Sequence, residues 1–371
     1  MKYLILSAHD YRTPRRASIH FLADELNTRG EVRFFSLRYS LLSKLKKDFR
    51  SSLDSKSNHV ENHNGIECYL WKTLIHPINT RRNYLAPFEN ILFRLFQKFP
   101  PQQLTDWIKD SDVIIIESGL AIIYFEYAKK INPNATFVYR ASDDLDTINV
   151  AQFIKDYFDL TSRKYDQVCM LSPLIGRNIS YKDNLYYVPN GVGKEMAIHG
   201  DPNPYSHRKN AVSVGSMLFD LSFFKVASKQ FPDVNFHLIG TGCTKDDLDA
   251  QNVIFYGHMP FYDTLKYIKH ADIGIAPYIT NAESAYLADS SMKMVQYDFY
   301  KIPSVCPEIV VGKYPNRFGY IPGDSVSIEN AMKMALNSKD SQNRPVYYWN
   351  EIVDRLLKPQ DYPDTKIEFD T

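Results

Sequence analysis

The sequence predicts an α/β protein built from two doubly wound domains. Short apolar runs with the length of buried strands alternate with segments whose apolar residues recur at helical spacing. This alternation occurs twice, on either side of a polar stretch at 200–208 that contains two prolines and a glycine. Two such series in 371 residues predict two parallel sheets, each covered by helices, facing each other across a cleft.

The first series starts at the N-terminus. Its clearest strand is 112–117, because four consecutive β-branched residues are typical of a parallel strand that is covered on both faces. A helix is expected at 15–27, ending near Gly30, and a polar, mobile loop is expected at 51–64. The expected strands are 2–8, 32–36, 65–71, 112–117, 136–140, 167–171 and 185–188.

The second series follows the polar stretch and repeats the same pattern. The expected strands are 211–215, 234–239, 253–256, 273–275 and 303–306, and the expected helices are 221–230, 262–270 and 289–299. A last helix is expected at 347–357. We therefore place an N-terminal domain at 1–199 and a C-terminal domain at 200–345, with 346–371 packing back on the N-terminal domain.

Composition excludes several classes of protein. With 44 Lys and Arg against 43 Asp and Glu, the chain lacks the strong positive charge of a dedicated nucleic-acid binder. Its 44% hydrophobic content excludes a disordered chain. The four scattered cysteines argue against a disulfide framework or a structural zinc site. With no secretory signal and no apolar run of about 18 residues, we expect a cytoplasmic protein whose membrane contact is peripheral.

Positive charge is concentrated in the first hundred residues, which hold 17 Lys and Arg against 9 Asp and Glu. Arg15 and Arg16, in the first strand-to-helix loop, suit an anionic ligand or form part of a basic surface. The segment 88–99 has one apolar helical face, flanked by Arg and Lys, that suits either the core or a membrane surface. That face consists of Phe88, Ile91, Leu92, Leu95, Phe96 and Phe99.

The motifs that the chain lacks exclude further classes of enzyme. The chain has no GxGxxG, no Walker sequence and no GxSxG elbow, so a dinucleotide oxidoreductase, a P-loop nucleotidase and an α/β-hydrolase lack support. A DxD pattern at 144–146 is repeated at 247–249, which makes it a weak metal signal. We expect no metal site.

Acidic residues follow the expected strand 136–140. A carboxylate placed there can take a proton from an attacking hydroxyl, whereas Ser and Asp in the same place also cap helices. We expect Asp144 and Asp146 to be capping residues, and spacing alone does not separate Asp143 from its neighbour.

The second domain offers two loops that could touch a nucleotide. His258 directly follows a strand, where it is either structural or placed near a ligand. Ser290 and its neighbours begin an expected helix whose N–H groups suit phosphate. Lys293 lies in the first turn, where a cation opposes the helix dipole unless a diphosphate balances its charge.

Several stretches of the chain together resemble the GumK-type glucuronosyltransferases of bacterial exopolysaccharide synthesis, which have the two-domain GT-B fold. The resemblance spans nearly the whole chain, and its last stretch is the most specific. The matching stretches are SAHDYRTPRRASIHF, RFFSLRYS, VYRASDDL, VPNGV, VGSMLFD, YGHM, YIKHADIGIAPY and YLADSSMKMVQYDF.

This resemblance implies an inverting, metal-independent transfer of glucuronic acid, without a cofactor, from UDP-glucuronate to a polyprenyl-diphosphate-linked oligosaccharide ending in mannose. The enzyme would work on the inner face of the cytoplasmic membrane. The family's base matches Asp143, and Asp220 matches a further acid of the family. The implied donor site consists of Met217, His258, Met259, Tyr278, Met292, Lys293 and Gln296.

Two alternatives stay open at this point. One is a GT-B enzyme that uses another nucleotide sugar, either as a transferase or as an epimerase. The other is a module that binds nucleotide sugars without catalysis, although an acid on one domain and a phosphate site on the other argue against it.

Overall fold

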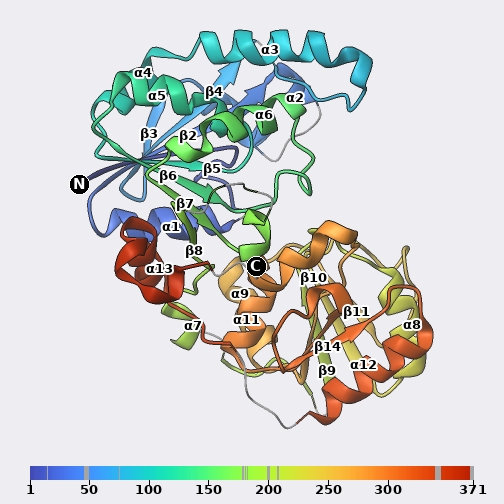
Figure 1. Cartoon of the computed structure of the whole chain (residues 1–371). Helices are drawn as coiled ribbons and strands as arrows, with labels where there is room; N and C mark the ends of the chain where they lie inside the picture. The colour runs from blue at the N-terminus through green and yellow to red at the C-terminus, as the bar shows by residue number, and fades with distance from the viewer. Residues whose placement is uncertain are drawn as a thin grey trace. The chain divides into compact units, whose positions relative to one another are not determined.

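The computed structural model of the chain divides into two compact units. The first comprises Met1–Val188 and Ile352–Thr371, and the second comprises Pro189–Glu351 (Figure 1). The residues that the structure describes are 1–14, 16–45, 50–74, 76–177, 179, 181, 183–198, 201–206, 209–338 and 344–367.

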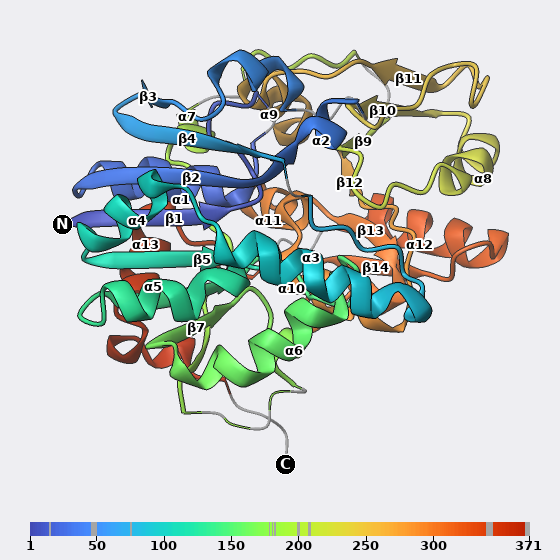
Figure 2. The same ribbon diagram turned by 90° about the horizontal axis from the view of Figure 1, so that it is seen from above.

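The first unit is built on an eight-stranded sheet in the order β3-β4-β2-β1-β5-β6-β7-β8. All pairs are parallel except β3 with β4, and β4, β2, β1 and β5 run side by side in Figure 2. The order reverses between β1 and β5, which is where doubly wound sheets bind ligands. The strands are β1 Lys2–Ser7, β2 Glu31–Ser40, β3 Val60–His63, β4 Ile66–Thr73, β5 Val113–Glu117, β6 Thr136–Ala141, β7 Gln167–Met170 and β8 Leu185–Tyr187.

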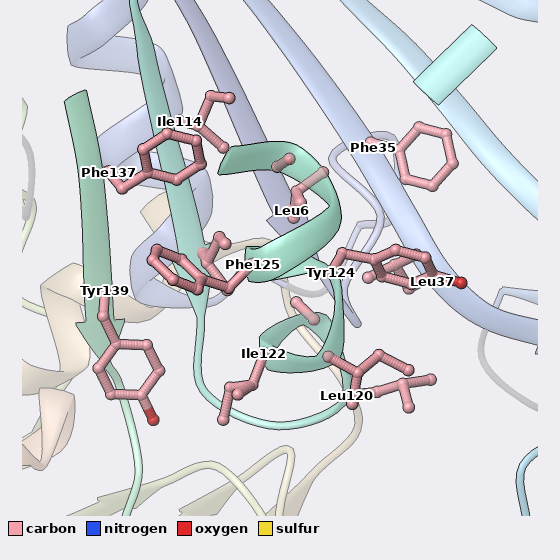
Figure 3. Packing of buried hydrophobic residues seen from close by; sticks show 14 of the residues in the cluster. Leu6, Phe35, Leu37, Ile114, Leu120, Ile122, Tyr124, Phe125, Phe137 and Tyr139 are labelled. Carbon is pink, nitrogen blue, oxygen red and sulfur yellow. The ribbon is translucent and has the colours of Figure 1, made fainter. Parts of the chain in front are cut away.

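Helices cover both faces of this sheet, with α1 and α13 on one face and α3 to α6 on the other (Figure 1). On the second face, Phe125 packs edge-on against Phe137 at 5.4 Å between ring centroids, beside Leu6 and Ile114 (Figure 3). The helices are α1 Ser18–Asn27, α2 Leu41–Leu45, α3 Ala86–Lys98, α4 Gln102–Lys109, α5 Phe125–Ile131, α6 Gln152–Thr161 and α13 Trp349–Leu357.

The second unit has a six-stranded, fully parallel sheet in the order β11-β10-β9-β12-β13-β14, with its reversal between β9 and β12. Its strands are β9 Lys209–Val214, β10 Val234–Ile239, β11 Val253–Tyr256, β12 Ile273–Ile275, β13 Ser304–Pro307 and β14 Arg317–Tyr320. Its helices are α7 Glu195–Ile198, α8 Ser222–Gln230, α9 Phe261–Lys269, α10 Leu287–Ser290, α11 Met292–Phe299 and α12 Ser325–Asn337.

Three local expectations were wrong or incomplete. The expected loop at 51–64 contains a 3₁₀ turn, Ser51–Lys56, and strand β3, which is polar because it lies at the sheet edge. The single helix expected at 289–299 is two helices, because Ser291 adopts an extended backbone between α10 and α11. Strand β14 was not expected, since its arginine and glycine give no apolar run.

The unit boundaries also differ from the expected ones, because residues 189–198 and 346–351 belong to the second unit. Val192 N donates to Tyr347 O and Trp349 N donates to Val192 O, both at 3.0 Å. The residues after Glu351 belong to the first unit, where Asp354 pairs with Arg29 and Leu357 O accepts from Gln167 at 3.1 Å.

We expect the C-terminal segment to contribute to the stability of the first unit. Leu356 on α13 is completely buried, so Leu356→Ala should lower the free energy of unfolding by about 2–5 kcal/mol. Leu160→Ala on α6 is the matched control, because that side chain is 74% exposed, and it should change the value by no more than about 0.5 kcal/mol. Denaturant titration measures both, and equal effects would contradict the docking of this segment.

Candidate active site

The first unit has a cavity of about 170 Å³ at the carboxyl ends of β1, β5 and β6. This position is the reversal point of the strand order, where the loops after three neighbouring strands leave the same edge of the sheet. Polar and apolar groups both contribute to its walls. They are Ala8, His9, Pro77, Asn79, Phe93, Glu117, Ser118, Gly119, Leu120, Asp143, Ile148, Asn149, Val150, Ala151 and Ile154.

Asp143 is the acid of the 143–146 segment that lines this cavity. Its backbone N–H donates to Ser118 Oγ at 3.2 Å. Asp144 instead accepts from the N–H groups of Asp146 and Thr147, both at 2.9 Å, and so caps a turn. It does not cap α6, which begins eight residues later. The structure thus separates Asp143 from Asp144, which spacing could not do.

Asp146 has a separate structural role. Its side chain is 60% exposed and forms an ion pair with Lys155 of α6. One member of the DxD pattern therefore caps a turn and the other pairs with a lysine. Within the described ranges, no group of three or more His, Cys, Asp or Glu residues is arranged to hold a metal ion.

Glu117, a buried carboxylate in the cavity wall, was not among the site residues expected from the sequence. It ends the apolar strand β5, and it accepts hydrogen bonds from the Ser142 hydroxyl at 2.9 Å and from the Ser7 hydroxyl. The sequence pattern that could have indicated Glu117 is a single acidic residue at the carboxyl end of an otherwise apolar strand. In a doubly wound sheet, that position faces the ligand side.

Two arginines of the first loop, Arg12 and Arg16, bind carboxylates of the protein. Arg16 pairs with Asp24 of α1. Arg12 is buried against Asp10 at 2.8 Å and also reaches Glu61 at 3.0 Å. Arg15 lies outside the described residues. The interpretation of Arg16 as a ligand-binding arginine therefore gains no support from its contacts.

In the second unit, the loops after β9 and β12 pair with each other. Asp220 N donates to Pro277 O at 2.8 Å, and Ile279 N donates to Leu218 O at 2.7 Å. Leu218 has a φ of 51°, in the left-handed region that costs energy for a branched side chain. The Asp220 carboxylate accepts from Ser222 N at 2.8 Å, at the start of α8. These bonds hold Tyr278 at the carboxyl end of the sheet.

Lys293 is the most unusual group of this unit. It is only 8% exposed, and its Nζ lies 3.4 Å from Ser213 Oγ and 5.2 Å from the centre of the Tyr278 ring. No carboxylate pairs with it among the described residues. Burial lowers the pKa of Lys293 to about 7. A buried cation with no anion beside it is a typical feature of a site for an anionic ligand.

Ser291 orients the start of α11. Its hydroxyl accepts from Met294 N at 3.3 Å and lies 2.5 Å from the Tyr278 hydroxyl. The other N–H groups of the first turn have no acceptor inside the helix, as at every helix start. Ser290 does not begin this helix, because it ends α10 and its carbonyl accepts from Asn190 at 2.8 Å, so the helix start expected at Ser290 lies at Ser291.

The remaining donor-site candidates lie at the same carboxyl edge but differ in exposure. Met217 is 46% exposed in the loop after β9, and Gln296 is buried one turn after Lys293. Met292 is half-buried at the first position of α11, while exposed His258 and half-buried Met259 follow β11. Direct contacts join Tyr278 with Ser291 and with Lys293. His258 and Met259 share only the edge of the sheet with them.

Comparison with known proteins identifies the family. Residues 5–171 match the model of the N-terminal domain of the glucuronosyltransferase GumK. A curated protein of Xanthomonas campestris pv. campestris, named UDP-glucuronate:glycolipid 2-beta-glucuronosyltransferase, is 50% identical over 98% of this chain and 91% of its own length. The chain belongs to the GumK family. It is therefore a glycosyltransferase of the glucuronosyltransferase class.

Solved structures show that this GumK-family enzyme has the GT-B fold. Sucrose-phosphate synthase from Thermosynechococcus elongatus has a TM-score of 0.68 at 12% identity, over 97% of this chain and 98% of its own. HepE from Anabaena, solved with UDP and glucose, has a TM-score of 0.65 at 14% identity, over 98% and 100%. At these identities the likeness shows the fold alone.

We expect Lys293 to weaken the folded state in the absence of ligand. Lys293→Met removes the cost of burying a charge and should raise the free energy of unfolding by about 0.5–2 kcal/mol. Because the folded pKa is about 7 and the unfolded value is 10.5, that cost is complete below pH 7 and shrinks as the pH rises toward 10.5. The gain should therefore be larger at pH 6.5 than at pH 9.

Denaturant titration at the two pH values measures this gain. Lys333→Met is the matched control, because Lys333 is 57% exposed and pairs with Glu329 on α12. Its effect should stay within about 0.5 kcal/mol at both pH values. A loss of stability in Lys293→Met would show that this lysine supports the fold.

Proposed function

We propose that this enzyme transfers glucuronic acid from UDP-glucuronate to a polyprenyl-diphosphate-linked oligosaccharide ending in mannose, in exopolysaccharide biosynthesis. The observation that carries the proposal is the identity of 50%, over nearly the full length, with a protein named for transfer from UDP-glucuronate to a glycolipid. That name also specifies a β product. Because the sugar of UDP-glucuronate is α-linked, a β product requires one displacement with inversion.

The second unit supports the donor half of this proposal. A diphosphate beside Lys293 would supply the anion that the buried ammonium group lacks, and the first turn of α11 would add N–H groups. During transfer, negative charge grows on the departing diphosphate. A fixed cation and fixed N–H groups stabilise that charge, which is the work that a metal ion does in other transferases. We therefore propose that transfer needs no metal.

The first unit supports the acceptor half. We propose that the Asp143 carboxylate accepts the proton of the attacking sugar hydroxyl. The hydroxyl oxygen forms a bond with the anomeric carbon while the bond from that carbon to the diphosphate oxygen breaks. The proton ends on Asp143, and the bonding electron pair leaves with UDP.

Asp143→Asn should reduce transfer by about 10²–10⁴-fold, because it removes the proton acceptor at that position. UDP affinity should stay within a few-fold of that of the unmodified protein. Transfer is measured with UDP-glucuronate and a mannose-terminated lipid-linked acceptor in EDTA, with NMR of the product to establish the anomer. UDP affinity is measured by calorimetry.

Asp146→Asn is the matched control, since that residue lies three positions away, pairs with Lys155 and is mostly exposed. It should retain nearly full transfer. Full activity of Asp143→Asn would exclude it as the base. Loss of activity in EDTA would contradict metal-free transfer, and preference for UDP-glucose or GDP-mannose would contradict the donor.

We also propose that the enzyme binds the inner face of the membrane through α3, which would bring it to a lipid-linked acceptor. This helix exposes Phe88, Ile91 and Leu95, with Phe99 just after its end, by 38–58%, while Phe93 and Phe96 are buried. The expected apolar stripe is therefore divided between the core and the surface. Exposed basic residues accompany it, namely Arg81, Arg82, Arg94 and Lys98. None of the helices in the described part of the chain is long and apolar enough to cross a membrane.

The double substitution Phe88→Ser and Ile91→Ser should weaken binding to vesicles of phosphatidylglycerol and phosphatidylethanolamine by about 10-fold or more, because both side chains lose apolar contact. Vesicle co-sedimentation measures the binding. Val326→Ser on α12, where the side chain is 62% exposed, serves as control and should bind normally. Equal binding by all three proteins would place the contact elsewhere.

A further inference from the structure

Glu117 is a buried carboxylate at the carboxyl end of a central strand of the first sheet. It closes β5, the strand between β1 and β6, and it is only 4% exposed. Burying a carboxylate is costly unless hydrogen bonds replace its water. Four apolar residues precede it in the strand, so the pattern of β5 alone gives no reason for an acid at this position.

One carboxylate oxygen of Glu117 is hydrogen-bonded to the residue that precedes Asp143. Its Oε1 accepts the Ser142 hydroxyl at 2.9 Å, and Ser142 immediately precedes Asp143. The next residue after Glu117, Ser118, accepts from Asp143 N at 3.2 Å and donates its own N–H to Arg140 O at 3.0 Å. Two consecutive residues, Glu117 and Ser118, therefore hold the backbone that leads into Asp143, from Arg140 to the Asp143 N–H.

The other carboxylate oxygen of Glu117 is hydrogen-bonded to the end of β1, where the next loop begins. Glu117 Oε2 accepts the hydroxyl of Ser7, the last residue of β1. The same serine oxygen accepts from His9 N at 2.9 Å. His9 and Asp143 both line the cavity of about 170 Å³. Glu117 thus connects the two loops that contribute these side chains, one on each side of its own strand.

We propose that Glu117 is a positioning residue for the transfer reaction, holding Asp143 through Ser142 and the His9 loop through Ser7. It acts through the two serine hydroxyls, and its role rests on the proposed function of Asp143 as the base. A carboxylate suits this role because both its oxygens accept, whereas a glutamine amide presents only one accepting atom. Proton transfer is sensitive to small displacements, so loosening Asp143 lowers the rate of the chemical step.

The test compares transfer kinetics, UDP affinity and thermal stability in Glu117→Gln and Ser142→Ala. Both variants should lower kcat by about 10–100-fold, as is typical when groups that orient a reacting residue are removed. Donor KM and UDP affinity should stay within about twofold, since the donor site lies in the other unit. Ser142→Thr keeps the hydroxyl and should return kcat to within about threefold of that of the unmodified enzyme.

Asp54→Asn is the matched control for loss of a partly buried carboxylate in the same unit. Asp54 accepts from Tyr39 at 3.0 Å and pairs with Lys44 at 2.8 Å and Lys72 at 2.7 Å, outside the cavity wall. It should lose stability but retain kcat. If Glu117→Gln does not fold, the comparison of kcat between Ser142→Ala and Ser142→Thr tests the positioning role by itself.

Three results overturn the inference. One is normal kcat in both Glu117→Gln and Ser142→Ala, and a second is an equal loss of kcat in Asp54→Asn. In both cases, a large loss in Asp143→Asn would leave the proposed function intact. The third is full activity of Asp143→Asn, which removes the base and, with it, the role given to Glu117.

Discussion

Parallel pairing of the central strands is the constraint on which both candidate sites depend. In the first sheet, Ile116 lies beside Leu6 on one side and Tyr139 on the other, so three strands end at nearly the same level. The loops that follow must leave at one edge, and the polar groups they carry meet there. The second sheet repeats this between β9 and β12, where Tyr278 and the loop before Asp220 are joined.

The two sites hold their buried charges in opposite ways. Glu117 is satisfied by hydroxyl groups of the protein on both sides, so its charge is stabilised before any ligand binds. Lys293 has a serine and an aromatic ring beside it, and burial lowers its pKa to about 7. A satisfied charge can fix geometry, whereas one that lacks a counter-charge gains stability from a ligand that brings one. This difference supports a positional role for Glu117 and a ligand role for Lys293.

The sequence predicted the alternation of strands and helices and the strand ends that carry candidate residues, because burial in a parallel sheet imposes an apolar run on each strand. Spacing alone could not separate Asp143 from Asp144, since the position of Asp143 depends on contacts with residues far away in the chain. Asp143 is held by Ser118, and Glu117 bonds to Ser7 across 110 residues. Breaks such as the one at Ser291 depend on local hydrogen bonds that helical periodicity does not report.

The placement of positive charge shows why composition alone could not point to α3 as the proposed membrane surface. Part of the positive charge in the first hundred residues is neutralised within the unit, because Arg12, Arg16 and Arg33 each pair with a carboxylate. The basic side chains beside the exposed face of α3 form no ion pair within the described ranges. Their charge is available to anionic lipid headgroups, and the adjacent apolar face adds an attraction that salt does not screen. The two contributions would act on the same helix, so the proposed membrane contact requires no further basic segment.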